Sequence, residues 1–244
     1  MEKKLSVIIP FYNELNVTNV IENVLKINFN NEVCVEIIAV DDGSTHFFKQ
    51  DFNKFKQTPN FKILVHNKNL GKGAAIKTGL SYCSGSIIII QDGDLEYDPK
   101  DIPSVISPIL NNETLVCYGS RHIDKNKLKK NYKWFRTHIG QAILPMLGGR
   151  IITYTCNILF NSKLTDVLTC YKAFDISLIK TMEFISNGFN FEAEITAKVL
   201  KQTKIKEVSI SYNPRTKKQG KKIKLKDGLK IIITLIKCKM SKKV

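Results

Sequence analysis

Short apolar runs alternate with longer mixed stretches over the first half of the chain. Five runs rich in β-branched residues have the length of buried strands and lie at 5–10, 35–40, 61–65, 86–90 and 114–118. Apolar residues at helical spacing make 13–27 a helix candidate, and further candidates are 72–82 and 101–110. The four isoleucines at 87–90 lack polar alternation, which is typical of a strand covered on both faces. The pattern predicts an α/β fold with a mostly parallel sheet and helices on both faces.

Polar clusters follow four of these runs. PFYNE follows the first, DDGST the second, QDGDLEYDP the fourth and GSR the fifth. Ligands of open parallel sheets bind at the carboxyl ends of the strands, where such loops gather. The sequence therefore predicts a binding site at this edge of the sheet.

The second half of the chain has a different texture. Residues 125–136 are strongly basic with aromatic residues among them, and 139–160 are apolar but interrupted by Pro145 and a glycine pair. This apolar segment fits an interfacial element and a buried helical hairpin equally well. A helix around 192–201 and a short strand near 206–212 complete the predicted fold before a basic tail.

Composition and charge narrow the class of protein. The 244 residues are 43% hydrophobic and 25% charged, which excludes a disordered or collagenous chain. No apolar run reaches the length of a membrane span, the start lacks a secretory core, and the six cysteines show no zinc-type spacing, so we expect a cytosolic protein. The net charge is +16, and residues 201–244 contain 15 basic and 2 acidic residues. Such a tail suits a solvated face, a nucleic acid or an anionic lipid surface.

The loop after the fourth predicted strand carries three carboxylates at alternate positions, on Asp92, Asp94 and Glu96. A turn can gather them around one cation, and oxygen ligands select a hard ion such as Mg2+ or Mn2+. The alternative is a surface acidic turn. A calcium loop is excluded, because Tyr97 and Pro103 stand where that motif needs Gly and Glu.

Two further turns carry polar side chains suited to a nucleotide. Asp42, followed by Gly43 and Ser44, suits contact with a base or ribose, or else forms a plain helix-capping loop. Lys72 lies between two glycines at a predicted helix start, which suits anion contact through backbone donors and one ammonium. The phosphate-binding P-loop and the dinucleotide pattern both fail at this position.

In this order the motifs SVIIPFYNE, VDDGST, NLGKGAAIKTG, QDGDLEYDP and YGSR resemble the nucleotide-sugar-binding half of family 2 glycosyltransferases. LTDVLTCYKAF, FNFEAEITAKV and SYNPRTKKQGKKIKLKDGLK look like the polyprenyl-phosphate (dolichyl-phosphate) mannose and glucose synthases. The resemblance covers about 5–230. It implies a Rossmann-like nucleotide-diphospho-sugar transferase fold, with a catalytic domain over 1–210 and a basic acceptor loop and amphipathic, membrane-facing helical tail over 211–244.

The resemblance also assigns residues to roles. It implies a nucleotide-sugar site made of Pro10, Tyr12, Glu14, Val40, Asp42, Lys72, Asp92, Gly93 and Asp94. Asp92, Asp94 and Glu96 are the implied metal ligands, although relatives often have Ala at the position of Gly93 and Gln at that of Glu96. The acceptor phosphate is expected to contact Arg121, Arg136 and Arg215.

The implied reaction is an inverting, metal-dependent transfer of a hexose from GDP-mannose or UDP-glucose to a polyprenyl or dolichyl phosphate. Asp94 and Arg121 are expected to be catalytic, because a cation and an arginine stabilise charge on the leaving diphosphate and the acceptor phosphate. That phosphate is already ionised and needs orientation more than deprotonation. Asp166 fits a base or a sugar-positioning residue, or else a helix cap. Glu192 and Glu194 fit sugar contact or a solvated helix face, and the solvated face is favoured.

The tail predicts a location at a membrane. Residues 229–236 are too short to span a bilayer, but with flanking lysines they suit an interfacial helix on the cytoplasmic face. One alternative is a soluble family 2 transferase that acts on a sugar hydroxyl and depends on Asp166 as base. Another is a basic nucleic-acid-binding protein, which is disfavoured because the acidic loop would repel phosphate.

Overall fold

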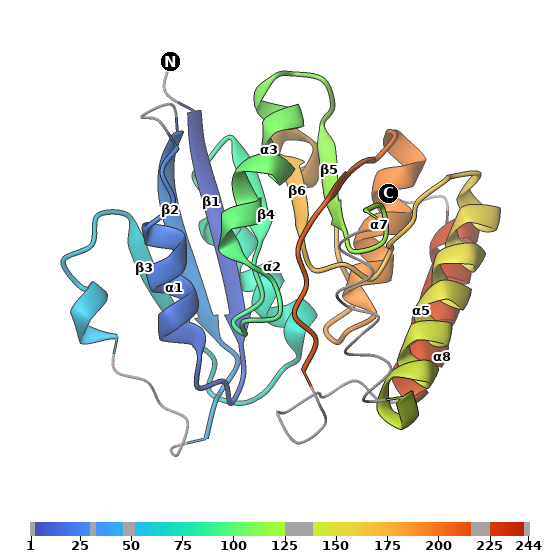
Figure 1. Cartoon of the computed structure of the whole chain (residues 1–244), viewed down its shortest axis with the longest axis horizontal. Helices are drawn as coiled ribbons and strands as arrows, with labels where there is room; N and C mark the ends of the chain where they lie inside the picture. Colours follow the sequence, from blue (N-terminus) through green and yellow to red (C-terminus); the bar gives the residue numbers. More distant parts are fainter. Residues whose placement is uncertain (1–2, 30–32, 46–51, 125–138, 216–224, 242–244) are drawn as a thin grey trace.

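A seven-stranded sheet forms the centre of the molecule (Figure 1). The structure is a computed structural model that describes residues 3–29, 33–45, 52–124, 139–215 and 225–241. The strands stand in the order β3-β2-β1-β4-β6-β5-β7. Their bounds are Lys3–Phe11 (β1), Val33–Asp41 (β2), Phe61–Val65 (β3), Ile87–Ile90 (β4), Val116–Ser120 (β5), Lys172–Asp175 (β6) and Lys206–Ser209 (β7).

Helices fill most connections between the strands, and α8 follows the last strand; the described residues also include two short 3-10 helices. The α-helices are Val17–Leu25 (α1), Lys72–Tyr82 (α2), Ile102–Leu110 (α3), Ile139–Phe160 (α5), Ile176–Ile179 (α6), Phe191–Gln202 (α7) and Leu225–Met240 (α8). The 3-10 helices are Asn53–Phe55 (η2) and Pro99–Asp101 (η3). The predicted helices near 13–27, 72–82, 101–110 and 192–201 are confirmed.

The sheet is mostly parallel, as the sequence predicts. β1 pairs in parallel with β2 and β4, and β2 pairs in parallel with β3. β6 runs antiparallel between β4 and β5, so the chain reverses direction in the middle of the sheet. The parallel strands point their carboxyl ends to one edge, where the polar clusters after β1, β2, β4 and β5 follow.

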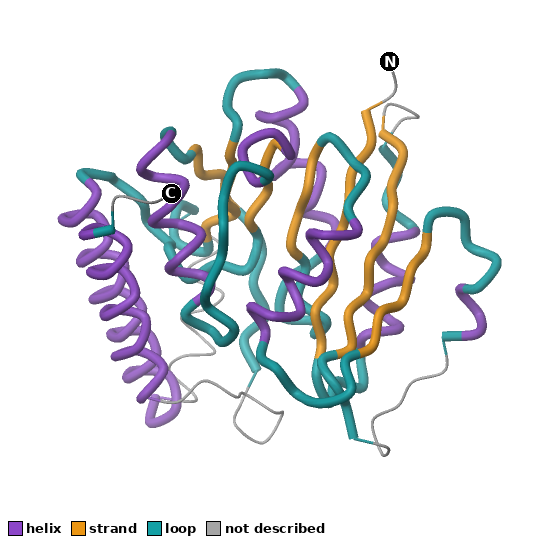
Figure 2. Tube along the Cα trace, turned by 180° about the vertical axis from the view of Figure 1, so that it is seen from behind, coloured by secondary structure: helices purple, strands orange, loops and turns teal. Residues whose placement is uncertain are grey.

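Both faces of the sheet are covered by helices, which explains the uninterrupted apolar strands. Leu5, Val7 and Ile9 of β1 lie in the main core with apolar residues of α1 and α3. On the other face, Ile8 lies against Gly79 of α2, where any side chain would collide with it. Figure 2, the view from behind, shows the strands between the helical layers.

A second, smaller core joins the tail to the rest of the molecule. Ile152 and Cys156 of α5 pack with Ala193 of α7 and with Ile231 and Leu235 of α8. Figure 1 shows α5 and α8 side by side at the edge of the molecule. Since α5 is one helix, the hairpin considered for 139–160 is wrong. None of the helices in the described ranges combines the length and hydropathy that a membrane span requires.

Candidate functional site

Segments from four parts of the chain meet at the carboxyl edge of the sheet. The backbone N–H of Asp42 after β2 donates to the carbonyl of Phe11 at 2.8 Å, and the N–H of Asn13 donates to Ser44 Oγ at 2.8 Å. The segment after β7 joins them, because the N–H of Asn213 donates to the carbonyl of Glu96 at 2.8 Å. In Figure 1 this orange-red segment runs toward the same edge.

The acidic loop begins where β4 ends and is held from both sides. Gln91 is fully buried and accepts a hydrogen bond from Tyr171 Oη at 2.5 Å. A side chain at Gly93 would come within 2.8 Å of Phe11 Cβ, so glycine lets the loop lie flat against β1. Within the loop, the N–H of Glu96 donates to Asp94 Oδ1 at 3.0 Å. The fold thus presents the carboxylates in fixed positions.

Arg215 lies among carboxylates of two loops. Its Nη1 is 2.8 Å from Glu14 Oε2, its Nη2 pairs with Asp94, and its Nε is 3.5 Å from Glu96 Oε1. Its backbone N–H also donates to Glu96 Oε1 at 2.8 Å, and Tyr212 Oη donates to Glu96 Oε2 at 3.1 Å. Two of the predicted metal ligands, Asp94 and Glu96, are therefore in direct contact with a predicted acceptor residue.

These carboxylates match a divalent cation in chemistry but do not form a closed cage. Among the residues that the structure describes, no group of three or more His, Cys, Asp or Glu side chains is arranged as a metal site. Instead, Lys72 Nζ holds Asp92 Oδ1 at 2.7 Å and Arg215 holds Asp94. Burial, with the charges of Asp92 and Glu96, raises the pKa of Asp94 to about 7 against the opposing effect of Arg215. This excess of negative charge and the all-oxygen donor set fit a hard cation such as Mg2+ or Mn2+.

The predicted nucleoside residues cluster next to this loop, where β1 and β2 run in register. Pro10 and Val40 are buried partners in neighbouring strands, and Tyr12 follows at the end of β1, half-buried. The carboxylate of Asp42 is committed to the fold, because Oδ1 pairs with His66 Nδ1 at 2.8 Å and Oδ2 accepts from the N–H of Gly71 at 2.7 Å. Asp42 therefore shapes the loop that leads into α2.

Arg121 and Asp166 form a partly buried ion pair with two hydrogen bonds. Nε of Arg121 is 2.6 Å from Asp166 Oδ2 and Nη2 is 2.7 Å from Oδ1. The guanidinium lies 5.0 Å from the ring centre of Tyr212 and 5.9 Å from that of Tyr97. Burial would raise the pKa of Asp166, but Arg121 outweighs it and lowers the pKa. A weakly basic carboxylate in this position orients Arg121 better than it removes a proton, and no helix starts here for it to cap.

Two acidic side chains of α7 are buried, so the solvated helix face favoured from the sequence is wrong. Glu194 accepts hydrogen bonds from the N–H groups of Ile185 and Ser186 at 2.9 and 2.7 Å, which fixes the turn before α7. Glu192 lies 2.9 Å from Lys72 Nζ and 2.6 Å from Lys172 Nζ. Periodicity could not identify these contacts, because the partners come from α2 and β6.

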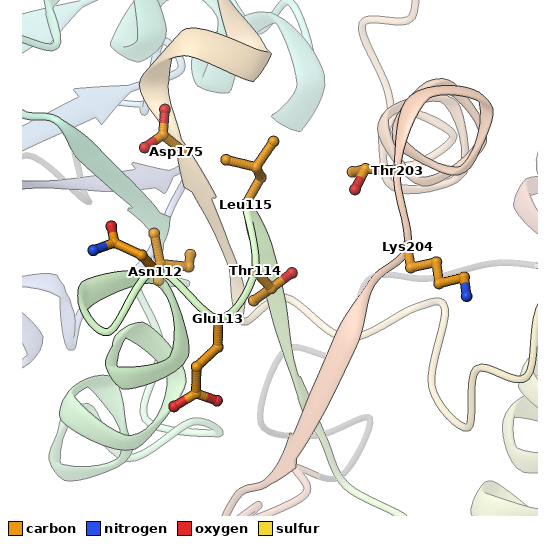
Figure 3. Close-up of a pocket in the computed structure, with 8 residues that line it drawn as sticks. Asn112, Glu113, Thr114, Leu115, Asp175, Thr203 and Lys204 are labelled. Atoms are coloured by element: carbon orange, nitrogen blue, oxygen red, sulfur yellow. The ribbon is translucent and has the colours of Figure 1, made fainter.

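The structure does not describe one predicted residue, and the hollow drawn in Figure 3 lies apart from the others. Arg136, expected at the acceptor phosphate, lies outside the described residues. Figure 3 shows Glu113, Thr114 and Lys204 at a hollow of about 410 Å3. This hollow includes Leu115, just before β5, and Asp175, the last residue of the antiparallel β6, so it lies at the edge opposite the carboxylates. It contains none of the predicted site residues.

Known proteins share both sequence and fold with this chain. The model of the glycosyl transferase family 2 matches residues 6–182. The chain is 28% identical over 217 residues to a dodecaprenyl-phosphate galacturonate synthase of Rhizobium johnstonii, a match that covers 87% of this chain and 60% of that protein. It is 26% identical over 223 residues to a dolichol-phosphate mannosyltransferase of Pyrococcus furiosus, covering 89% and 59%. The chain thus spans about 60% of the length of these relatives.

The fold also matches solved structures. A crystal structure of glucosyl-3-phosphoglycerate synthase from Mycobacterium tuberculosis with Mn2+, UDP-glucose and phosphoglyceric acid has a TM-score of 0.70 and 17% identity, covering 97% of this chain and 80% of that one. At this identity the likeness concerns the fold, and it confirms the predicted nucleotide-sugar transferase architecture. With the family match over 6–182, it follows that the chain belongs to glycosyl transferase family 2.

Proposed function

We propose that this protein transfers a hexose from a nucleotide sugar to a polyprenyl phosphate, with inversion at the anomeric carbon. The observation that carries the proposal is Arg215. It lies in the basic segment expected to bind the acceptor, and it contacts Glu14 and Asp94 of the two loops expected to bind the donor. The contact of Arg215 with Glu14 and Asp94 supports a donor and an acceptor that would meet at this edge of the sheet. Both relatives described above are named for transfer to, or synthesis on, lipid phosphates.

The donor is expected to lie across the ends of β1, β2 and β4. Pro10, Tyr12 and Val40 would line the nucleoside, while Lys72 would contact the diphosphate. Asp92, Asp94 and Glu96 would hold Mg2+ or Mn2+, and related folds have been crystallised with Mn2+ or Mg2+ and uridine diphosphate. A bound divalent cation would supply charge that stabilises the departing diphosphate.

The acceptor phosphate needs orientation and charge compensation at the opposite side of the sugar. Arg121 is held rigidly by Asp166 and flanked by two tyrosine rings, which suits a planar fork that binds phosphate oxygens. Arg215, once released from its carboxylates, and Arg136 would complete the phosphate site. Because an ionised phosphate attacks without losing a proton, the reaction requires no general base. In-line displacement would convert an α-linked donor into a β-linked product.

The protein would work at the surface of a membrane, because its acceptor is a lipid. Two helices expose apolar side chains at matching spacing: Leu147, Ile151, Tyr154 and Ile158 on α5, and Leu229, Ile233, Ile236 and Met240 on α8. Each lysine near an anionic surface contributes about 1 kcal/mol, and α8 carries Lys230, Lys237 and Lys239. We propose peripheral attachment to the cytoplasmic face by these helices.

A donor panel tests the proposal. Purified protein with Mn2+ is mixed with a short polyprenyl phosphate and, in turn, GDP-mannose, UDP-glucose and a UDP-activated galacturonate. One donor should give a lipid-linked sugar, and Asp94→Asn should abolish the product. Asp98→Asn is the matched control, because Asp98 lies in the same loop but is not a predicted metal ligand and accepts a hydrogen bond from the N–H of Lys100. Full activity of the Asp94 variant, or no transfer from any donor, would refute the proposal.

A further inference from the structure

A chain of alternating charges runs from the inside of the sheet to the acidic loop. Lys172 Nζ lies 2.6 Å from Glu192 Oε2, Glu192 Oε1 lies 2.9 Å from Lys72 Nζ, and Lys72 Nζ lies 2.7 Å from Asp92 Oδ1. Lys172 is completely buried and Glu192 almost so. Lys172 and Glu192 have no part in the donor and acceptor contacts proposed above.

The inner end of this chain is fixed by its surroundings. Lys172, on β6, also donates to the carbonyl of Thr169, and its ammonium lies 4.9 Å from the ring centre of Tyr118. Glu192 is in the first turn of α7, where the helix dipole favours a negative charge. The carboxylate of Glu192 is therefore held from below by Lys172 and presents its second oxygen to Lys72.

The two glycines beside Lys72 explain how it reaches Glu192. A side chain at Gly71, which has φ 104°, would come within 2.3 Å of the carbonyl of Asn187, and one at Gly73 within 2.7 Å of Phe191 Cβ. The N–H of Ala74 donates to that same Asn187 carbonyl at 3.1 Å. The start of α2 thus packs on the turn before α7. This contact occupies the N–H of Ala74, one of the backbone donors at the helix start that the sequence suggested for an anion.

Stability alone does not account for the buried pair. Replacing a buried ion pair by apolar residues of similar volume is often neutral or stabilising. The pair instead orients Lys72. A free lysine side chain carries about 2 kcal/mol of rotamer entropy, and a fixed Glu192 limits that freedom before the ligand binds. Burial would lower the pKa of Lys72, but Asp92 and Glu192 outweigh it and raise the pKa, so the ammonium keeps its charge.

We infer that Glu192, held by Lys172, is a positioning residue that fixes the ammonium of Lys72 where the donor diphosphate binds. The inference rests on the proposed function. The outer partner, Asp92, belongs to the predicted metal and diphosphate loop, and the side chain of Lys72 retains 17% exposure there. Lys72 can exchange the Asp92 oxygen for a phosphate oxygen while Glu192 still holds it from behind.

Nucleotide affinities test this inference, with UDP and GDP each compared with its monophosphate in Mg2+. The double variant Lys172→Met/Glu192→Leu removes both charges and keeps the net charge and approximate volume. It should weaken diphosphate binding about tenfold, leave monophosphate binding within about twofold, and melt no lower than the wild type. Lys72→Met should show the same selective loss of diphosphate affinity, and the size of this loss is the largest effect that displacing Lys72 can have.

A folded double variant with the wild-type ratio of diphosphate to monophosphate affinity would overturn the inference. Should that variant fail to fold, Glu192→Gln keeps the shape and removes the charge, and the same unchanged ratio would refute the positioning role. If the wild-type protein binds neither UDP nor GDP, the proposed function is refuted, and the inference is refuted with it.

Discussion

Arg215 serves as the counter-ion of the acidic cluster, and its removal has a calculable effect. Its side chain is 20% exposed and contacts Glu14, Asp94 and Glu96, which are 11–14% exposed. Breaking a buried ion pair costs about 3–5 kcal/mol, and partial exposure reduces this to about 2–3 kcal/mol. In a protein of this size 1 kcal/mol corresponds to about 2–4 °C. Arg215→Gln should therefore melt about 4–12 °C below the wild type in EDTA.

The same substitution should strengthen metal binding, because it removes a competing cation from the carboxylates. Mn2+ should bind the variant several-fold more tightly, by about tenfold if the released charge contributes 1.4 kcal/mol, and should raise its melting temperature more than that of the wild type. Thermal melts over a Mn2+ titration measure both effects.

Lys206→Gln is the matched control, since it removes the same charge from a solvent-exposed pair with Glu113. It should change the melting temperature little and leave the response to Mn2+ at the wild-type level. Equal melting of Arg215→Gln and wild type in EDTA, or equal shifts with Mn2+, would refute the counter-ion role.

Three further results are expected. Asp166→Asn should raise the acceptor KM at least about tenfold with donor KM unchanged, because it frees the arginine it holds; a collapse of kcat at unchanged acceptor KM would identify a base instead. Asp94 has a folded-state pKa of about 7, above its ordinary 3.8, so protonation favours the metal-free fold. As pH rises from about 4 to 7, ionisation of Asp94 should lower the stability of the protein in EDTA. Mn2+ affinity, measured at pH 6, 7 and 8, should rise and then level off. An Mn2+ affinity independent of pH would contradict the assignment of Asp94 as a metal ligand. Finally, the double variant Ile151→Ser/Tyr154→Ser should reduce flotation with anionic vesicles at least about tenfold without lowering the melting temperature. The control Val65→Ser on β3 should float like the wild type. Equal flotation of the two variants would disprove the docking face.

β1, β2, β4 and β5 were predictable because each contains a short apolar run that is buried in the sheet. β6 was not, since the KAFD run is short and its place depends on antiparallel pairing with β4 and β5. α5 contains Pro145 and a glycine pair, yet it is continuous, because packing against α7 and α8 outweighs the helix propensity of those residues.

The candidate site was predictable wherever a loop follows a parallel strand. Sequence order put Asp92, Asp94 and Glu96 after a buried strand, and the structure presents them at the expected edge. The sequence could not show that Arg215, more than a hundred residues away, pairs with these carboxylates. Nor could it show that Glu192 and Lys172 meet inside the protein. Such contacts depend on which surfaces of the fold come together, and no local spacing encodes them.

The chemical nature of the acceptor distinguishes a lipid-phosphate transferase from a transferase that acts on hydroxyl groups, and one comparison of acceptors tests it. With the donor that the panel identifies, wild-type protein and Mn2+ are given a short polyprenyl phosphate, the matching polyprenol without phosphate, and a free oligosaccharide. The arginine-lined site predicts sugar transfer to the phosphate alone, as a β-linked product. Transfer to the polyprenol or the oligosaccharide, with the phosphate left unused, would contradict it.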